Sequence, residues 1–278
     1  MDISINEQPA DIVLESEKTV GDLLSGIEEW LQGSANRISG LRIDGHTINA
    51  VSLPEVCEQD LQNITSIDIT VSSWQDLALE ALVNIREDLK IYETGSFEEQ
   101  RHIKDSWEAS VTAHFLAEQI PDIFVLAHKT ILGEGLAPGD MTRIIDERIR
   151  ELIDPFAELK NISALISDVA VRLEDIPLDI QTGKDSKVAE TVQFFSHIVD
   201  KLFRLVRFLR LQGYVVDTIS VDTLPFNSFI DAFSAILKEL LTAYEAQDAV
   251  LVGDLAEYEL APRLLKLYSA INDKGWMT

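Results

Sequence analysis

The chain has 278 residues, is 46% hydrophobic and carries a formal net charge of −25. A chain of this length and apolar content can bury a sizeable core, so the composition excludes a fully disordered protein. Its single cysteine, Cys57, excludes a disulfide framework, a cysteine-ligated iron–sulfur cluster and a CxxC redox site.

The charge and the hydropathy pattern give expectations about location and partners. No run of about 18 uncharged apolar residues occurs, and the N-terminus lacks the basic and apolar segments of a signal peptide. We therefore expect a cytoplasmic protein, which agrees with the lone thiol. The acidity argues against binding to nucleic acid or to a membrane, because phosphate backbones and anionic lipids would repel the chain.

The acidity is concentrated at the front of the chain. Residues 1–73 contain 13 acidic and 3 basic side chains, whereas residues 74–278 contain 35 and 20. Per residue, the front segment is thus about twice as acidic, and this difference indicates two domains.

Several stretches of the front segment have the period-two alternation of half-buried strands. Residues 8–11 have the composition of a turn, and Asp44-Gly45 is a strong hairpin sequence with Ile48 across it. The predicted strands are residues 1–6, 12–15, 38–43 and 66–71.

One helix is predicted between these strands. Thr19 and Asp22 have the spacing of a capping box, and Gly33 is a stop. The apolar positions between them recur at helical spacing: Val20, Leu23, Leu24, Ile27, Trp30 and Leu31. A short helical turn is predicted over residues 53–57.

The order strand, strand, helix, strand, short strand, strand resembles the ubiquitin-like β-grasp fold. The matching sequences are Thr19-Val20, residues 41–45 and residues 66–71. The resemblance covers residues 1–73 and implies an interaction module, or else a lid packed on the rest of the chain. It does not imply conjugation or sulfur carriage, because the last strand runs on into Trp74 instead of ending in Gly-Gly.

The exposed face of this sheet is expected to differ from that of ubiquitin. Ubiquitin has an apolar docking patch there, whereas the outward positions of this chain are Arg42, Asp68 and Thr70. A receptor of the ubiquitin type would therefore meet a polar surface.

Residues 74–278 are predicted to form an all-α domain, either a bundle or an array of helical hairpins. We find no convincing strand pair there, and a polar linker is predicted over residues 177–185. Asp140 is expected to cap the fourth helix, and Pro155 and Pro262 are expected to kink the helices that contain them. The predicted helices are residues 74–91, 96–119, 121–132, 140–174, 188–211, 225–246 and 249–272. The fold class is thus α+β, with a β-grasp domain at 1–73 and a larger helical domain at 74–278.

Candidate catalytic and metal-binding groups are sparse. Glu99 and His102 have the Glu-x-x-His spacing of di-iron bundles, but no second such pair occurs. His114 and Glu118 lie four residues apart on the same predicted helix, a spacing more typical of an exposed ion pair. These four residues are the best polar cluster available to an enzyme or to a ligand site between the domains.

Other reactive residues have structural interpretations. His197 lies among apolar residues and is expected in or at the edge of the core, and Cys57 has no local base to activate it. The glycine-rich loop at residues 133–139 contains Glu134 and Pro138, so it is a helix connector and not a phosphate loop. We therefore assign no catalytic, metal-binding or cofactor-binding residue and expect no cofactor.

The most unusual stretch is a basic helix at residues 201–210, where four cations interrupt apolar residues at a spacing of three. Because three residues turn a helix by about 300°, the cations drift around it. They either form a surface for an acidic partner or a membrane, or they reach outward and pair with acidic neighbouring helices, for which Asp254, Glu257 and Glu259 are the expected partners. The cations are Lys201, Arg204, Arg207 and Arg210.

These patterns favour a non-enzymatic adaptor, regulator or scaffold that binds another protein, with a homodimer through long helices as one form of it. The four cations are the candidate partner-binding residues. Two alternatives remain open: an enzyme or a small-ligand or metal-binding protein with a site between the domains, and a peripheral membrane or polymer-associated protein that uses the basic helix.

Overall fold

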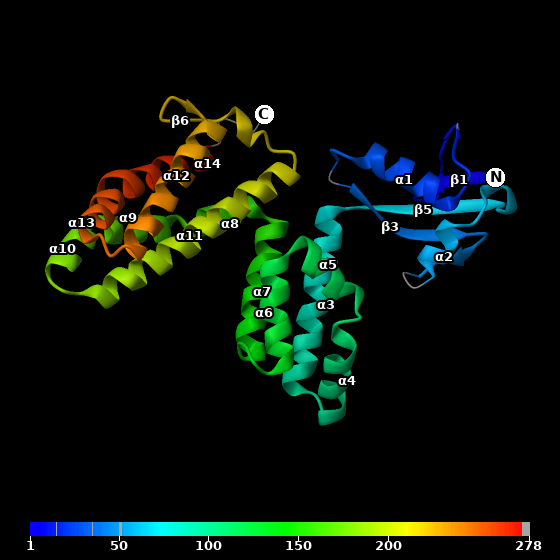
Figure 1. Cartoon of the computed structure of the whole chain (residues 1–278), viewed down its shortest axis with the longest axis horizontal. Coiled ribbons are helices and arrows are strands. Elements are labelled where there is room, and N and C mark those ends of the chain that lie inside the picture. Colours follow the sequence, from blue (N-terminus) through cyan, green and yellow to red (C-terminus); the bar gives the residue numbers. More distant parts are fainter. Residues whose placement is uncertain (15, 35, 50–51, 274–278) are drawn as a thin grey trace. The chain divides into compact units, whose positions relative to one another are not determined.

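The computed structural model describes residues 1–14, 16–34, 36–49 and 52–273. Its contacts divide the chain into two compact units, Met1–Asp146 and Glu147–Thr278 (Figure 1). The first unit begins with a mixed sheet and continues with helices, and the second unit is mainly helical. The chain is therefore an α+β protein with an N-terminal sheet and a helical remainder, as the sequence predicts.

The sheet of the first unit has five strands in the order β2-β1-β5-β3-β4. β1 pairs in parallel with β5, and the other neighbouring strands are antiparallel. Along β5, Ile67 and Ile69 are buried and alternate with the more exposed Asp68 and Thr70. The strands are β1 (Asp2–Ile5), β2 (Gln8–Pro9), β3 (Asn36–Ile43), β4 (His46–Thr47) and β5 (Ser66–Ser73).

Helix α1 (Val20–Leu31) shares one core with the sheet. Its start is the predicted capping box: Asp22 N donates to Thr19 Oγ1 at 3.2 Å, and Thr19 N donates to Asp22 Oδ2 at 2.9 Å. The backbone N–H groups of Lys18 and Thr19 both donate to the Asp22 carboxyl and hold its pKa below its ordinary value. The short predicted helix is also confirmed as α2 (Leu53–Cys57), and a 3₁₀ turn, η1 (Leu61–Asn63), follows it.

The predictions of a turn at residues 8–11 and of a strand over residues 12–14 are wrong. The turn lies earlier, at Asn6 and Glu7, which both have positive φ (51° and 62°), and residues 12–14 have no regular structure. Glu15 lies outside the described residues. The Asn6 side chain is held by the backbone of Val71 through hydrogen bonds of 3.0 and 2.8 Å. A tertiary contact thus fixes this turn, whereas the predicted Asp44-Gly45 hairpin forms as expected.

The helices of the first unit start directly from the sheet. Ser73 ends β5 and also caps α3, because its Oγ accepts a hydrogen bond of 3.0 Å from Asp76 N. The buried Trp74 donates from Nε1 to Gln119 Oε1 at 3.0 Å. These helices are α3 (Trp74–Thr94), α4 (Phe97–Trp107), α5 (Val111–Gln119) and α6 (Pro121–Leu132); α7 (Pro138–Ile153) runs from the first unit into the second.

Residues 96–119 form two helices where the sequence predicted one. Ser110 starts α5 by accepting a hydrogen bond of 3.0 Å from Ala113 N, so the backbone leaves the helical path before it. The loop at 133–139 is the helix connector that the sequence predicted, and Gly133 ends α6 with a φ of 80°. Asp140 is not a cap, because α7 already begins at Pro138.

The second unit contains more breaks than the sequence predicted. Pro155 starts a new helix instead of kinking a longer one, and a short helix occupies the predicted linker. A small hairpin corrects the prediction of no strand pair: it turns at Asp222 and Thr223, both with positive φ. The elements are α8 (Pro155–Asn161), α9 (Ser163–Glu174), α10 (Ile176–Gln181), α11 (Asp185–Leu211), η2 (Val216–Thr218), β6 (Ser220–Val221), β7 (Leu224–Pro225) and α12 (Phe226–Glu245).

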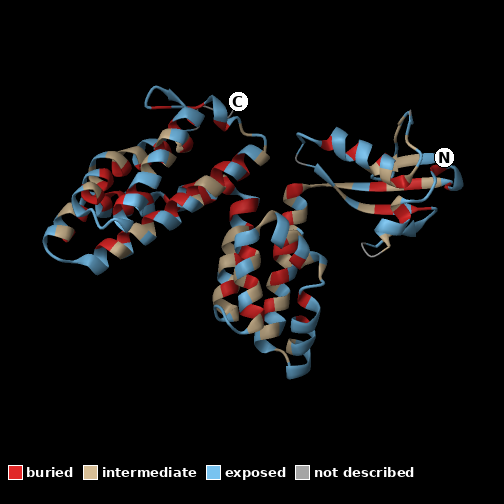
Figure 2. Ribbon diagram, viewed as in Figure 1, coloured by how far each residue is buried: buried red, intermediate tan, exposed pale blue. Residues whose placement is uncertain are grey.

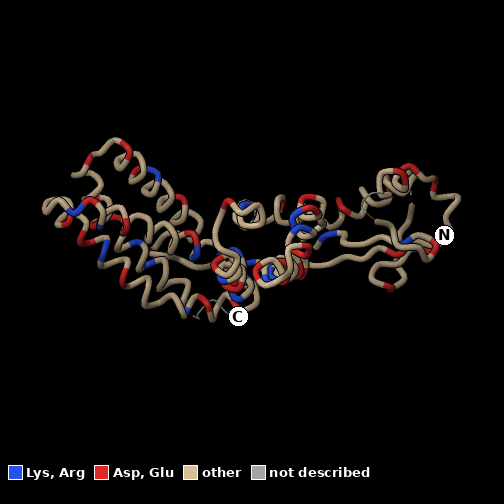
Figure 3. The backbone as a smooth tube through the Cα atoms, turned by 90° about the horizontal axis from the view of Figure 1, so that it is seen from below, with Lys and Arg blue, Asp and Glu red and all other residues tan. Residues whose placement is uncertain are grey.

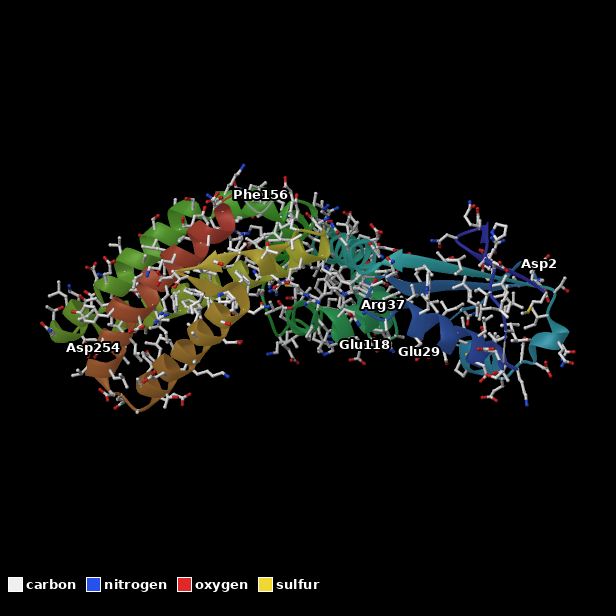
Figure 4. The ribbon with its side chains drawn as sticks, turned by 90° about the horizontal axis from the view of Figure 1, so that it is seen from above. Asp2, Glu29, Arg37, Glu118, Phe156 and Asp254 are labelled. Carbon is white, nitrogen blue, oxygen red and sulfur yellow. The ribbon has the colours of Figure 1, made fainter. Side chains whose placement is uncertain are left out.

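The last helical stretch deforms before Pro262. A π-helical segment, η3 (Leu255–Leu260), separates α13 (Ala249–Asp254) from α14 (Ala261–Asn272). Pro262 has no N–H for the carbonyl of Tyr258, and widening the preceding turn accommodates this loss. Asp254, labelled in Figure 4, is the residue at which α13 passes into the π-helical segment.

The core of the second unit lies mainly between α9, α11, α12 and α14 (Figure 2). Phe195, Phe226, Phe229 and Phe233 are almost fully buried, and the Phe229 and Phe233 rings stack with centroids 6.3 Å apart. Each long helix buries one stripe and exposes the other face to solvent, as an amphipathic helix of a bundle does. His197 lies on the exposed face of α11, so its predicted core position is wrong.

Candidate functional site

The basic helix predicted at residues 201–210 lies within α11, and its first cation is held by three glutamates. Lys201 Nζ lies 2.5 Å from Glu147 Oε1, 3.0 Å from Glu158 Oε2 and 3.7 Å from Glu151 Oε1. Burial alone would lower the pKa of Lys201, but the hydrogen bonds to Glu147 and Glu158 outweigh it and raise that pKa.

Arg204 forms a two-pronged pair with Glu151, whose side chain is fully buried. Arg204 Nε and Nη2 donate to the two carboxylate oxygens at 3.0 and 3.1 Å, and Arg148 donates to one of them at 3.3 Å. Burial raises the pKa of Glu151 to about 7, although the cations Arg148 and Lys201 oppose this shift. The carboxyl group is therefore poised to exchange its proton near neutral pH.

Glu158 completes this charge network, which joins α7, α8 and α11. Burial favours its neutral form, but the hydrogen bonds from Lys201 and Asn161 hold its pKa below the ordinary value. The partners expected from the sequence were wrong. The acidic side chains come from α7 and α8, and Glu259 pairs with Arg263 of its own segment at 2.7 Å.

The two other predicted cations are exposed. Arg210 pairs with Asp217 at 2.5 Å, bonds Asn227 at 3.0 Å and lies over the Phe226 ring. Arg207 also lies on the exposed side of α11. Lys201 and Arg204 are thus held inside one molecule, whereas a partner-binding role for Arg207 and Arg210 stays a prediction.

The polar cluster Glu99, His102, His114 and Glu118 is exposed on α4 and α5. Glu99 is part of a capping box, and the hydrogen bonds from Ser96 lower the pKa of its carboxyl. His114 Nδ1 lies 2.9 Å from the Ser110 carbonyl oxygen. Across residues 1–14, 16–34, 36–49 and 52–273, no three His, Cys, Asp or Glu side chains are grouped to hold a metal ion.

An apolar groove of about 470 Å³ lies between α1 and a segment of the first unit that includes residues 10–12, and the sequence did not predict it. Trp30 at its edge is 71% exposed, although its helical spacing placed it with the apolar core residues. Val13 and Leu14 are also exposed, at 78% and 36%. The groove is lined by Ile5, Ala10, Asp11, Ile12, Leu14, Glu17, Leu23, Gly26, Ile27 and Trp30.

The groove includes part of the segment that the sequence predicted as a strand. Residues 12–14 have no regular structure, and Ile12 and Leu14 line the groove beside α1. The clue in the sequence is the helical spacing of Leu23, Ile27 and Trp30, which places these three apolar side chains along one face of α1.

A second hollow of about 660 Å³ lies on the polar side of the sheet, where Arg42 and Asp68 are among the lining residues. Ser4 Oγ donates to Asp68 Oδ1 at 2.5 Å, so the groups on this face bond to one another. The expected polar character is confirmed, since Arg42 and Thr70 are exposed.

Similar proteins are known for both parts of the chain. Residues 1–73 are similar to a family described as the TP0873 N-terminal domain, and residues 157–270 to a family described as a domain of unknown function (DUF8042). An uncharacterized protein of Treponema pallidum (strain Nichols) is 24% identical over 271 residues, which are 98% of this chain and 96% of that protein. No solved structure matches the chain. None of these similarities assigns an activity.

The length and hydropathy of the helices show whether any of them could span a membrane. Among those of the described residues, none combines the length and the apolar character needed to cross a bilayer. Acidic positions occur along the tube of both units, as Figure 3 shows, which agrees with the net charge of −25.

Proposed function

We propose that this chain is a non-enzymatic protein-interaction module, an adaptor, regulator or scaffold of the cytoplasm. The observation that carries this proposal is the apolar groove beside α1, which the exposed side chains of Trp30 and Leu14 line. Large apolar side chains gathered at the surface mark interaction sites, and tryptophan is among the residues that most often dominate binding energy.

The two alternatives have less support. An enzyme or metal protein would use Glu99, His102, His114 and Glu118, but these side chains face solvent and Glu99 is engaged as a helix cap. A surface for a membrane or polymer would use the basic helix, but Lys201 and Arg204 are paired with buried glutamates.

We also propose that residues 1–73 form a ubiquitin-like β-grasp domain with its boundary at residues 73/74. Its support is the observed order of strands and α1, a hydrophobic core built from residues of this segment alone, and the family match that ends at residue 73. Expression of residues 1–73 by themselves tests the boundary. A well-dispersed amide spectrum is expected, and a collapsed, unfolded spectrum contradicts the proposal.

Photo-crosslinking in the native cell tests the adaptor function. A photoreactive phenylalanine analogue is placed at Trp30, and a second variant carries it at Phe97, which is 79% exposed but lies outside the groove. A discrete protein adduct is expected at position 30 and not at position 97. If positions 13 and 30 and the basic residue Arg207 all give no protein adduct, the proposed function is wrong.

A further inference from the structure

We infer that the groove beside α1 binds a protein segment that combines large apolar side chains with flanking lysine or arginine. This inference rests on the proposed interaction function and adds the chemistry of the partner. It is carried by three features of the first unit: a glycine with open space above it, an exposed tryptophan at the groove edge, and acidic residues along the same surface.

The glycine is Gly26, in the middle of α1. A glycine in a helix interior destabilises the helix by about 0.5–1 kcal/mol relative to alanine, so a glycine at such a position calls for a structural reason. For Gly21, the reason is packing, because a Cβ atom there would lie 3.1 Å from the Cys57 carbonyl oxygen. For Gly26, no described atom outside the neighbouring backbone of α1 lies within 4 Å of the Cβ position. None of the described residues requires glycine there by packing, whereas a partner seated in the groove would approach the bare backbone.

The apolar lining has the geometry of a helical recognition stripe. Leu23, Gly26, Ile27 and Trp30 follow the spacing i, i+3, i+4 and i+7 along α1, and all four line the groove. Leu23 and Ile27 form the buried floor, and Trp30 stands 71% exposed at the edge. A bulky apolar side chain of the partner can lie over Gly26 against the Trp30 ring, the arrangement of an interface anchor.

The charge around the groove is acidic. Asp11 and Glu17 line it, and Glu29, which Figure 4 labels, is exposed on the same helix directly before Trp30. Residues 1–36 hold eight acidic side chains and one basic one, Lys18. Such a rim attracts lysine and arginine and repels acidic segments.

The acidic charge favours one of three candidate ligands: a second copy of the chain, a small molecule or a basic protein segment. A second copy of the chain would bring a net charge of −25 against a surface of the same sign, and like charges across an interface disfavour association. A small molecule would need several convergent polar groups to fix its orientation, whereas among the described lining residues Asp11 and Glu17 are the ionisable ones. A basic and apolar protein segment matches both the lining and the rim.

The test uses the full chain and two synthetic peptides. Each peptide has about 14 residues, enough to span the roughly 18 Å of α1. The first contains only leucine and lysine in an amphipathic helical pattern, and the second has glutamate in place of every lysine. Binding is measured by fluorescence anisotropy at ~0.15 M salt, where long-range attraction is screened. The lysine peptide is expected to bind at least about tenfold more tightly than the glutamate peptide.

Matched variants locate the binding site. Gly26→Leu fills the groove and should weaken binding at least about tenfold, whereas Ser25→Leu adds the same side chain beside it and should change binding less than about twofold. Asp11→Lys should weaken binding more than Glu55→Lys, which makes the same change of charge on α2, away from the groove. If Gly26→Leu does not fold, Trp30→Ala serves in its place, with Phe97→Ala as its control.

Several outcomes of these binding measurements would contradict the inference. Equal binding of the two peptides, equal effects of Asp11→Lys and Glu55→Lys, or unchanged binding by the groove variant all overturn the inference. So does a dimer, detected by light scattering, that Gly26→Leu abolishes. A crosslinked partner at Trp30 combined with failure of the lysine peptide overturns this partner chemistry alone, whereas the absence of any crosslinked partner overturns the proposed function itself.

Discussion

The groove beside α1 exposes apolar side chains to solvent, whereas the charge network of the second unit buries charged ones. At the groove, a tryptophan that could be buried is exposed, and a glycine faces open space. In the charge network, Glu151 is fully buried and three cations surround it. Exposing apolar surface and burying charge each lower stability unless something compensates. In the charge network, ion pairs within the chain compensate for the burial of Glu151. At the groove, none of the described residues covers the exposed face of Trp30. We therefore propose a binding role for the groove and a structural role for the network.

The largest expected effect comes from breaking the buried pair. Arg204→Gln leaves the Glu151 carboxylate without its two-pronged partner, and removing one member of a buried pair destabilises by about 3–5 kcal/mol. Because Arg148 and Lys201 remain beside Glu151, we expect a loss of about 3 kcal/mol at pH 8, measured by urea unfolding followed by circular dichroism. Arg207→Gln on the exposed side of the same helix should lose less than about 1 kcal/mol. Equal losses would contradict internal support by Arg204.

The second effect depends on pH. The pKa of Glu151 is raised from 4.5 to about 7 in the folded chain, so between these values the folded state holds a proton that the unfolded state has released. The contribution of Glu151 to the free energy of unfolding is therefore fully present below pH 4.5 and is lost as the pH rises through 7. Linkage makes this change about 3 kcal/mol as an upper estimate.

The matched variant for this pH effect is Glu151→Gln, which cannot titrate. Urea unfolding at pH 5, 6, 7 and 8 should show a stability that falls more steeply with pH in the unmodified chain than in the variant. Parallel profiles would mean that Glu151 keeps an ordinary pKa and that the cations fully compensate its burial.

A smaller effect separates the two glycines of α1. Gly26→Ala should stabilise the chain by about 0.5–1 kcal/mol, because alanine favours the helix and meets no neighbour. Gly21→Ala should be destabilising instead, since its methyl group lies against the Cys57 carbonyl. Tryptophan fluorescence reports the unfolding of the first unit if Trp276 is replaced by phenylalanine, because Trp30, Trp74 and Trp107 all belong to that unit. Destabilisation by Gly26→Ala would show that the chain itself needs this glycine.

The smallest expected effect concerns Trp30. Trp30→Ala should change the free energy of unfolding by no more than about 0.5 kcal/mol, because the side chain is 71% exposed. Trp107→Ala, in the same unit but 2% exposed, should lose about 3–5 kcal/mol. Thermal and urea unfolding of both variants measure this difference, and a large loss for Trp30→Ala would assign the tryptophan to the core and weaken the groove proposal.

Features that depend on residues close together in the chain could be predicted from the sequence. The capping box at Thr19 and Asp22, the Asp44-Gly45 turn and the alternation along β5 all form as predicted, since each depends on residues that are neighbours in the chain. The helical character of the remainder follows from periodicity in the same way. For the candidate site, the sequence singled out Lys201, Arg204, Arg207 and Arg210 but could not assign their partners.

Features that depend on residues far apart in the sequence were decided only by the tertiary structure. The turn at Asn6 is held by Val71, Glu151 is paired with Lys201 and Arg204 from another helix, and Trp30 is exposed although the adjacent Leu31 is buried. The sequence by itself determined the two classes of structure and the sites of many helix ends, because hydrogen bonds within a few residues dictate them. Burial and pairing depend on which surfaces meet, and only packing of the whole chain selects among the many compatible partners.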